Sequence, residues 1–179
     1  MDLRQHGSGN LGATNAVRVL GPRIGALVYA GDTLKGMLPA LLLPRVITAS
    51  QPDLWAVGFG LAAIVGHVRP IFLLGQGGGK GVATAGGVFF GLASVPTIIA
   101  LAAFLLVVAA TRFVSAGSIA AAIVLPTSIG LFRGPSSPVF LISVVVSAFV
   151  IWMHRGNLSR LFSGTEPRIG APRKTEADR

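Results

Sequence analysis

The sequence predicts an all-α integral membrane protein folded as a compact helical bundle, and three observations lead to that class. Hydrophobic residues make up 52% of the 179-residue chain, charged residues only 12%, and the mean hydropathy is +0.73. Soluble domains carry about 25% charged residues. Long apolar runs rich in glycine and alanine alternate with short polar segments, and no strand-type alternation appears. We therefore expect packed membrane helices in a single domain over residues 1–179.

The apolar runs predict six membrane spans. They cover residues 24–43, 54–66, 82–93, 96–110, 113–131 and 139–153. The stretch 82–111 exceeds one ordinary span, and Ser94-Val95-Pro96 divides it. An amphipathic helical turn at the membrane surface is expected over 154–161, followed by a flexible, basic cytoplasmic tail over 167–179.

The formal net charge of +9 is placed mostly between or after the apolar runs. That distribution follows the positive-inside rule, so we expect the lipid bilayer and anionic small molecules as partners, and no nucleic acid. With six spans, four polar clusters share the cytoplasmic face: residues 7–18, 66–84, 111–118 and 154–166. The chain has no cysteine, which excludes disulfides, thiolate nucleophiles and zinc–thiolate sites, and we expect no metal or cofactor.

The polar cluster around Lys80 is a run of glycines, Gly75-Gln76-Gly77-Gly78-Gly79-Lys80-Gly81. Glycines leave backbone N–H groups accessible, the lysine adds a positive charge, and a helix beginning near Gly81 or Val82 would direct free N–H groups to the same place. The spacing does not match a Walker loop. Such a loop either cradles a phosphate or is only a flexible turn between two helices.

Polar residues inside or beside the spans have plain structural explanations as well. Asp32 and Lys35 lie three residues apart on one helical face, and a structural ion pair is the preferred interpretation over substrate contact. His67 is either a hydrogen-bonded residue at a span end or a group of the neighbouring glycine loop. Ser115 and Ser118 share a face and fit helix–helix contacts.

The four clusters together are rich in hydroxyls, amides and cations, with Glu166 as their only carboxylate. This composition predicts an anion-binding site. It lacks the paired carboxylates of glycosidases and two-metal enzymes, and no G-x-S-x-G elbow is present.

Several motifs carry a family resemblance across nearly the whole chain. They are residues 7–15, Gly66-His67 with Pro70, residues 78–84, and His154-Arg155 with Asn157, Arg160-Leu161 and Gly164-Thr165-Glu166. In this order they resemble the three signature segments of the bacterial acyl-phosphate:glycerol-3-phosphate acyltransferases (PlsY-type). Asp32 with Lys35-Gly36, and Val114-Ser115 with Ser118, are secondary matches.

The resemblance implies an acyltransferase of phospholipid biosynthesis in the bacterial inner (cytoplasmic) membrane, with its active site facing the cytoplasm. The expected reaction moves a fatty acyl group from acyl phosphate to the 1-hydroxyl of sn-glycerol 3-phosphate, giving lysophosphatidic acid and phosphate. The expected catalytic residues are Ser8, Lys80, His154 and Asn157. The expected substrate-binding residues add Asn10, Thr14, Asn15, Arg18, His67, Gly78, Gly79, Gly81, Thr84 and Ser115, while Asp32, Lys35 and Glu166 are expected to be structural. The proton acceptor is either His154 or a substrate phosphate.

The sequence departs from the family pattern in four places. The family has a seventh, hydrophobic helix before the first motif, whereas six residues precede Gly7 here; we expect either a longer natural chain or a six-helix protein. The interval from Pro70 to Lys80 is one residue longer, Gly75-Gln76-Gly77 stands in place of an aromatic–lysine pair, and Gly156 and Leu158 replace an acidic residue and an isoleucine.

Two other functions fit a basic membrane protein. A transporter or channel for organic phosphates predicts polar residues along a path through the membrane and internal repeats. The polarity here gathers at one face, and no clear repeat is present. A non-catalytic assembly factor has no need for so many glycines and cations in one place.

Overall fold

The computed structural model describes residues 2–48 and 50–170, and every regular element among them is helical. The elements are η1 (Leu3–Gln5), α1 (Ala13–Leu20), α2 (Pro22–Val46), α3 (Pro52–Val68), η2 (Ile71–Leu73), α4 (Val82–Leu92), α5 (Ser94–Thr111), α6 (Val114–Arg133), α7 (Pro138–Met153) and α8 (Arg155–Phe162). The all-helical class expected from the sequence is confirmed.

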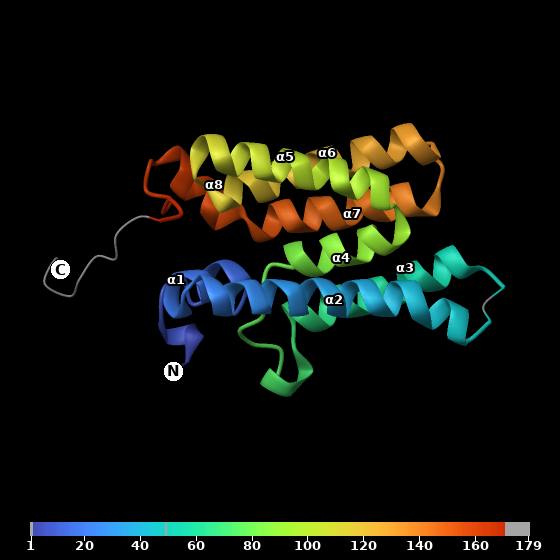
Figure 1. Cartoon of the computed structure of the whole chain (residues 1–179), viewed down its shortest axis with the longest axis horizontal. Helices are drawn as coiled ribbons and strands as arrows, with labels where there is room; N and C mark the ends of the chain where they lie inside the picture. Colours follow the sequence, from blue (N-terminus) through green and yellow to red (C-terminus); the bar gives the residue numbers. More distant parts are fainter. Residues whose placement is uncertain (1, 49, 171–179) are drawn as a thin grey trace, which may run out of the picture.

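The helices form two groups that meet along α4. Helix α2 packs on α1, α3 and α4, while α5 packs on α6 and α6 packs on α7. Helices α3 and α4 both contact α7, and α4 contacts α5, which joins the groups (Figure 1). The short helices α1 and α8 lie at one end of the bundle, and the α2–α3 and α6–α7 connections lie at the other (Figure 1).

Glycines allow α2 and α4 to cross closely. A Cβ atom added at Gly36 would lie 2.2 Å from the carbonyl oxygen of Thr84, and one added at Gly87 would lie 2.0 Å from that of Thr33. No side chain fits in either place. Small residues at helix crossings are the usual means of tight packing in membranes, where apolar burial alone does not favour helix contact.

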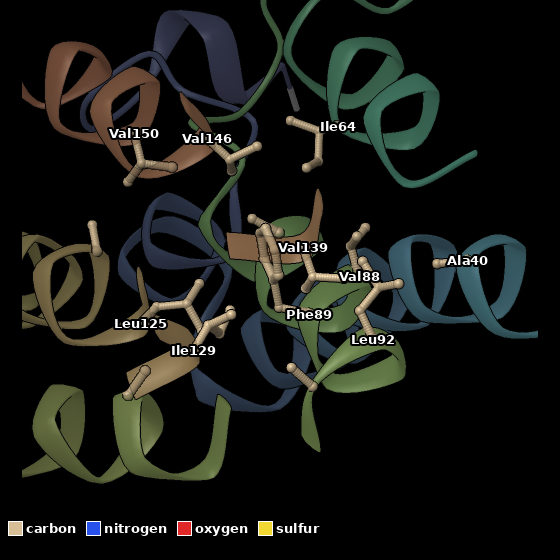
Figure 2. Packing of buried hydrophobic residues seen from close by; sticks show 14 of the residues in the cluster. Ala40, Ile64, Val88, Phe89, Leu92, Leu125, Ile129, Val139, Val146 and Val150 are labelled. Atoms are coloured by element: carbon tan, nitrogen blue, oxygen red, sulfur yellow. The ribbon is translucent and has the colours of Figure 1, made fainter. Parts of the chain in front are cut away.

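A shared apolar core fixes α4 between the two groups. Phe89 of α4 is almost fully buried, and so are Ile129 of α6 and Val139 of α7. Figure 2 shows Phe89 and Val139 side by side, with Val88 and Leu92 of α4 next to them. This core positions the beginning of α4, and therefore the glycine loop before it.

Several helices begin at residues that favour a helix N-terminus. Proline occupies the first turn of α2, α3 and α7, where the missing N–H costs nothing. Ser137 caps α7 by accepting a hydrogen bond from the backbone N–H of Phe140 at 3.1 Å.

Among residues 2–48 and 50–170, four helices are long and apolar enough to cross a membrane: α2, α3 continued through η2, α5 and α6. Helices α7 and α8 count as a fifth span if the 54° bend between them is included. The one remaining predicted span, 82–93, corresponds to α4, an apolar helix of only 11 residues. The expected run is therefore present, but it is too short to cross a bilayer alone.

Three details differ from the sequence expectations. Residues 13–20, for which no helix was predicted, form helix α1. Helix α2 continues through Pro44 to Val46, beyond the end of the span predicted over 24–43. The break in the stretch 82–111 falls at Ala93, because Pro96 fits within the first turn of α5. Residues 171–179 of the expected tail lie outside the described residues.

Candidate active site

Three hydrogen bonds join the four polar clusters at the end of the bundle that carries α1 and α8. Asn10 donates through Nδ2 to the carbonyl oxygen of Gly78 at 3.2 Å. Lys80 Nζ donates to Asn157 Oδ1. Ser115 Oγ donates to Glu166 Oε1 at 2.7 Å. The clusters 7–18, 66–84, 111–118 and 154–166 therefore form one site.

The glycine loop packs directly on the end of α3. A Cβ atom at Gly78 would lie 2.1 Å from the carbonyl oxygen of Val68, and one at Gly79 would lie 2.0 Å from Nε2 of His67. Gly79 also donates its N–H to the carbonyl oxygen of His67 at 3.3 Å. These contacts fix the loop in a way that only glycine permits.

Gly81 has a φ of +83° and is the N-cap of α4, so the helix begins where the sequence predicts. Within the described part of the chain, the backbone N–H groups of Val82, Ala83 and Thr84 have no acceptor. Free N–H groups at a helix N-terminus bind anions. The beginning of α4 therefore combines free N–H groups with the neighbouring Lys80 ammonium, which is the chemistry of an anion site.

Lys80 is half-buried and surrounded by other charges. Burial lowers its pKa below the ordinary value, the Glu166 carboxylate opposes that change, and Arg160 and Arg18 add to it. Two guanidinium groups close enough to act on the ammonium make this a region of concentrated positive charge. An anionic ligand would offset the cost of keeping Lys80 charged there.

Glu166 is the carboxylate that holds the site together. It is 9% exposed and accepts hydrogen bonds from Asn157 Nδ2 at 2.6 Å, from Ser115 Oγ at 2.7 Å and from Arg160 Nε at 2.8 Å. Burial alone would raise its pKa, but these three donors outweigh burial and lower it. The result is a buried anion that orients Asn157 toward Lys80.

His154 lies in the bend between α7 and α8 and is 3% exposed. Its Nδ1 is 2.8 Å from the carbonyl oxygen of Val150, so Nδ1 carries the proton as donor and Nε2 keeps a lone pair. Burial lowers its pKa to about 4, with the positive charge of Lys80 acting in the same direction. His154 is therefore a neutral imidazole at neutral pH.

The N-terminal segment forms a loop next to the glycines. Asn15 is 1% exposed, and its Oδ1 accepts from the backbone N–H of Ser8 at 2.8 Å. Asn10 Oδ1 accepts from the N–H of Gly12 at 2.7 Å. These amides shape the loop, and Ser8 is exposed on it. Thr14 is exposed on α1.

Thr84 and Ser118 belong to helix packing. Thr84 is fully buried where α2 crosses α4, with its methyl group against Gly36 and no hydrogen-bond partner for Oγ1 among the described residues. Ser118 Oγ donates to the carbonyl oxygen of Val114 at 2.9 Å. The Thr84 side chain lies in the contact between α2 and α4, and its expected role in substrate binding stays a prediction.

Asp32 and Lys35 form an ion pair at 2.5 Å, as their spacing suggests, and His67 joins it. A groove of about 350 Å³ between α2 and α3 borders Lys35 and His67 and is otherwise apolar. No cluster of metal-ligating side chains occurs within residues 2–48 and 50–170.

Arg160 was not among the predicted site residues. Its guanidinium bonds Glu166 and acts on Lys80, from the turn of α8 that follows Asn157. The signal was present, since Asn157 and Arg160 are three residues apart on a helix and so face the same side.

Comparison with known proteins gives one consistent result. The family model described as glycerol-3-phosphate acyltransferase matches residues 1–164. A glycerol-3-phosphate acyltransferase of Trichlorobacter lovleyi is 49% identical over 172 residues, covering 96% of this chain and 86% of the relative. One of Geobacter sulfurreducens is 44% identical with the same coverage.

The solved structures agree with these relatives. The crystal structure of PlsY (YgiH), an integral membrane glycerol 3-phosphate acyltransferase, in its glycerol 3-phosphate form matches with a TM-score of 0.87 and 38% identity over 95% of this chain and 83% of that one. Its lysophosphatidic acid form matches with a TM-score of 0.82 at 37% identity, over 91% of this chain and 81% of that one. With this fold, these motifs and a cationic site that joins all of them, the chain belongs to the glycerol-3-phosphate acyltransferase family of integral membrane proteins.

Proposed function

We propose that this protein transfers a fatty acyl group from an acyl phosphate to the 1-hydroxyl of sn-glycerol 3-phosphate, producing lysophosphatidic acid and inorganic phosphate. The reaction is a committed step of phospholipid synthesis. The observation that carries the proposal is a hydrogen-bond network that joins the glycine loop to α8. Lys80 donates to Asn157, and Asn157 donates to Glu166. The positive charges of Arg18 and Arg160 act on the Lys80 ammonium.

The chemistry of the two reactants matches the site. Both carry a phosphate, and the site offers free N–H groups of α4 together with a half-buried ammonium. The alkyl chain of the acyl donor would lie against apolar helix surfaces and lipid. Because the phosphate ester of a carboxylic acid is already activated, orientation of the reactants and stabilisation of the developing charge supply the acceleration.

The hydroxyl proton has two candidate acceptors, His154 and a substrate phosphate, and we assign it to the phosphate. The 1-hydroxyl oxygen forms a bond with the acyl carbon, the bond from that carbon to the phosphate oxygen breaks, and the hydroxyl proton leaves. His154, with a pKa of about 4, is a weaker base than a phosphate, whose second pKa is about 6. The phosphate group therefore accepts the proton, and His154 orients the reactants.

We place the site on the cytoplasmic face of the bacterial inner membrane. The basic residues at the end of the bundle that carries α1 and α8 support this orientation through the positive-inside rule. The expected substrate roles of Ser8, Asn10, Asn15, Arg18, Gly78, Gly79, Gly81 and Ser115 are part of the same proposal.

The test is a donor comparison with purified protein in detergent. Palmitoyl phosphate and palmitoyl-CoA are each offered with glycerol 3-phosphate, and both lysophosphatidic acid and released phosphate are measured. We expect equal amounts of the two products from palmitoyl phosphate and none from the thioester. Lysophosphatidic acid formed only from the thioester would refute acyl phosphate as the donor. A Lys80→Met protein, measured in the same assay, gives the background rate of product formation.

A further inference from the structure

Asp32 and Lys35 of α2 and His67 of α3 form a polar group at the back of the glycine loop, in which Asp32 and His67 are largely buried and the Lys35 side chain is 44% exposed. Lys35 Nζ lies 2.5 Å from Asp32 Oδ1 and 2.7 Å from His67 Nδ1. The His67 side chain is 7% exposed, and Asp32 Oδ1 is 3.4 Å from its Nδ1. A simple ion pair between α2 residues needs no third partner, so the histidine of α3 calls for an explanation.

The donor and acceptor chemistry of these groups fixes the tautomer of His67. A lysine ammonium has donors only, and a carboxylate has acceptors only. An ammonium at 2.7 Å therefore requires a lone pair on Nδ1. In a neutral imidazole the proton then sits on Nε2. The opposite tautomer would place an N–H against the ammonium and leave the longer 3.4 Å contact with Asp32 as its only compensation.

The protonated nitrogen faces the glycine loop. A Cβ atom built on Gly79 would lie 2.0 Å from Nε2 of His67, so this edge of the ring lies against the loop residue that precedes Lys80. The loop is also held to the same residue, because Gly79 N–H donates to the His67 carbonyl oxygen. Within the described part of the chain, Nε2 has no hydrogen-bond acceptor of its own.

We propose that Asp32 and Lys35 are positioning residues of the active site: Lys35, held by Asp32, fixes His67 as the Nε2–H tautomer and so presents an N–H donor at Gly79 toward a phosphate bound by the loop. The inference rests on the proposed function for its ligand, a phosphomonoester. The Asp32–Lys35 pair then contributes to substrate binding through His67. His67 would add a side-chain donor to the backbone donors of α4.

The first experiment reads the tautomer and does not depend on activity. Protein labelled with ¹⁵N-histidine in detergent micelles gives nitrogen shifts for His6, His67 and His154, and a His67→Gln sample identifies the signals of His67. We expect the protonated shift on Nε2 and the unprotonated shift on Nδ1 in the wild-type protein. Protonated Nδ1 in the wild-type protein would overturn the proposal.

The second experiment removes the ammonium without leaving a charge unpaired. In the double variant Asp32→Asn with Lys35→Met, the fixed tautomer should be lost, so that both nitrogens of His67 show averaged shifts. The KM for glycerol 3-phosphate should rise about tenfold with kcat within about twofold, because a donor that serves substrate binding is lost. An unchanged tautomer or an unchanged KM would each overturn the proposal.

A control variant separates positioning from general damage. Asp53→Asn removes the carboxylate of the Arg133–Asp53 pair, at 3.5 Å, which involves the beginning of α3 and the end of α6. It should leave the tautomer and KM unchanged. If the double variant does not fold, the wild-type spectrum alone decides. Failure of the donor comparison with palmitoyl phosphate, beside an Nε2–H spectrum, would reject the proposed reaction and leave the tautomer assignment standing.

Discussion

The side chains of Lys80 and Asn157 are hydrogen-bonded to each other across a separation of 77 residues. This bond connects the glycine loop to α8, and Asn157 in turn donates to Glu166. Lys80 is therefore the only ammonium that the described part of the structure shows bonded to the segment 154–166. Its charge and its position both depend on residues far away in the sequence.

Replacing Lys80 by methionine should lower the turnover number of acyl transfer at least about 100-fold. Methionine keeps most of the volume but provides no charge or donor, and loss of one such donor at a developing charge costs a factor of at least about 100 in turnover. The measurement is kcat and KM with palmitoyl phosphate, beside thermal unfolding in the same detergent. Near-normal turnover would refute the hypothesis that Lys80 and the glycine loop bind a phosphate. If the methionine variant loses both folding and activity, Lys80→Arg becomes the deciding variant.

Replacing Asn157 by alanine should raise the KM for glycerol 3-phosphate or lower turnover. The change removes the acceptor for Lys80 and one donor to Glu166. Asn157→Asp is the matched variant: it keeps the size and the acceptor but places a second carboxylate beside Glu166. Unchanged kinetics in the alanine variant would exclude Asn157 from the site.

Replacing Glu166 by glutamine should destabilise the protein by about 2–3 kcal/mol, because hydrogen bonds to a buried charge are lost. The pKa of Glu166 is lowered by folding, so its carboxylate contributes stability that is present above the unfolded value of 4.5 and is lost as pH falls through the folded value. The wild-type protein should thus lose stability below about pH 4.5, and the variant should show less of this dependence. Asp53→Asn, an exposed carboxylate, should not reproduce it.

His154 should make stability depend on pH in a second window. Its pKa is about 4 in the folded protein against 6.5 without burial, so the unfolded chain takes up the proton first as pH falls from 6.5 toward 4. Stability should fall over that window, by up to about 1.4 kcal/mol per pH unit. Thermal unfolding of His154→Gln should show a flatter profile there, and His6→Gln, on an exposed residue, should match the wild-type profile.

Replacing Gly87 by alanine should destabilise the bundle, and replacing Gly86 should not. A Cβ atom at Gly87 would collide with the carbonyl oxygen of Thr33 at 2.0 Å, whereas Gly86, its neighbour on α4, has open space. We expect a cost of about 2 kcal/mol or more for Gly87→Ala and a neutral or slightly favourable change for Gly86→Ala. Equal melting temperatures for the two variants would contradict the close crossing of α2 and α4.

Much of this organisation was predictable because membranes restrict the choices. Apolar runs gave the helices, and the alternation of spans placed the four polar clusters at one end, where hydrogen bonds such as Asn10 to Gly78 and Ser115 to Glu166 join them. The beginning of α4 was predictable from Gly81, because a helix start next to free N–H groups has a local signature.

The remainder depends on contacts between distant residues. Helix α1 was missed because Thr14 and Asn15 resemble caps and turns, although Asn15 in fact is buried and ties the preceding loop. The spacing of Asp32 and Lys35 predicted their pairing, but nothing in the sequence states that His67, 32 residues further along, completes it. The crossing of Gly36 and Gly87 likewise exists only after α2 and α4 have met.

Because α4 is shorter than α5, the glycine loop before α4 does not reach the level at which α5 ends. Helix α5 rises about 27 Å over its 18 residues and α4 about 16 Å over its 11, and both meet at Ala93. The glycine loop is therefore recessed by about 10 Å relative to the end of α5 at Thr111. In the proposed reaction, a phosphate arriving from water would have to enter the protein to reach Lys80, and the apolar helices around the loop would be available to the acyl chain.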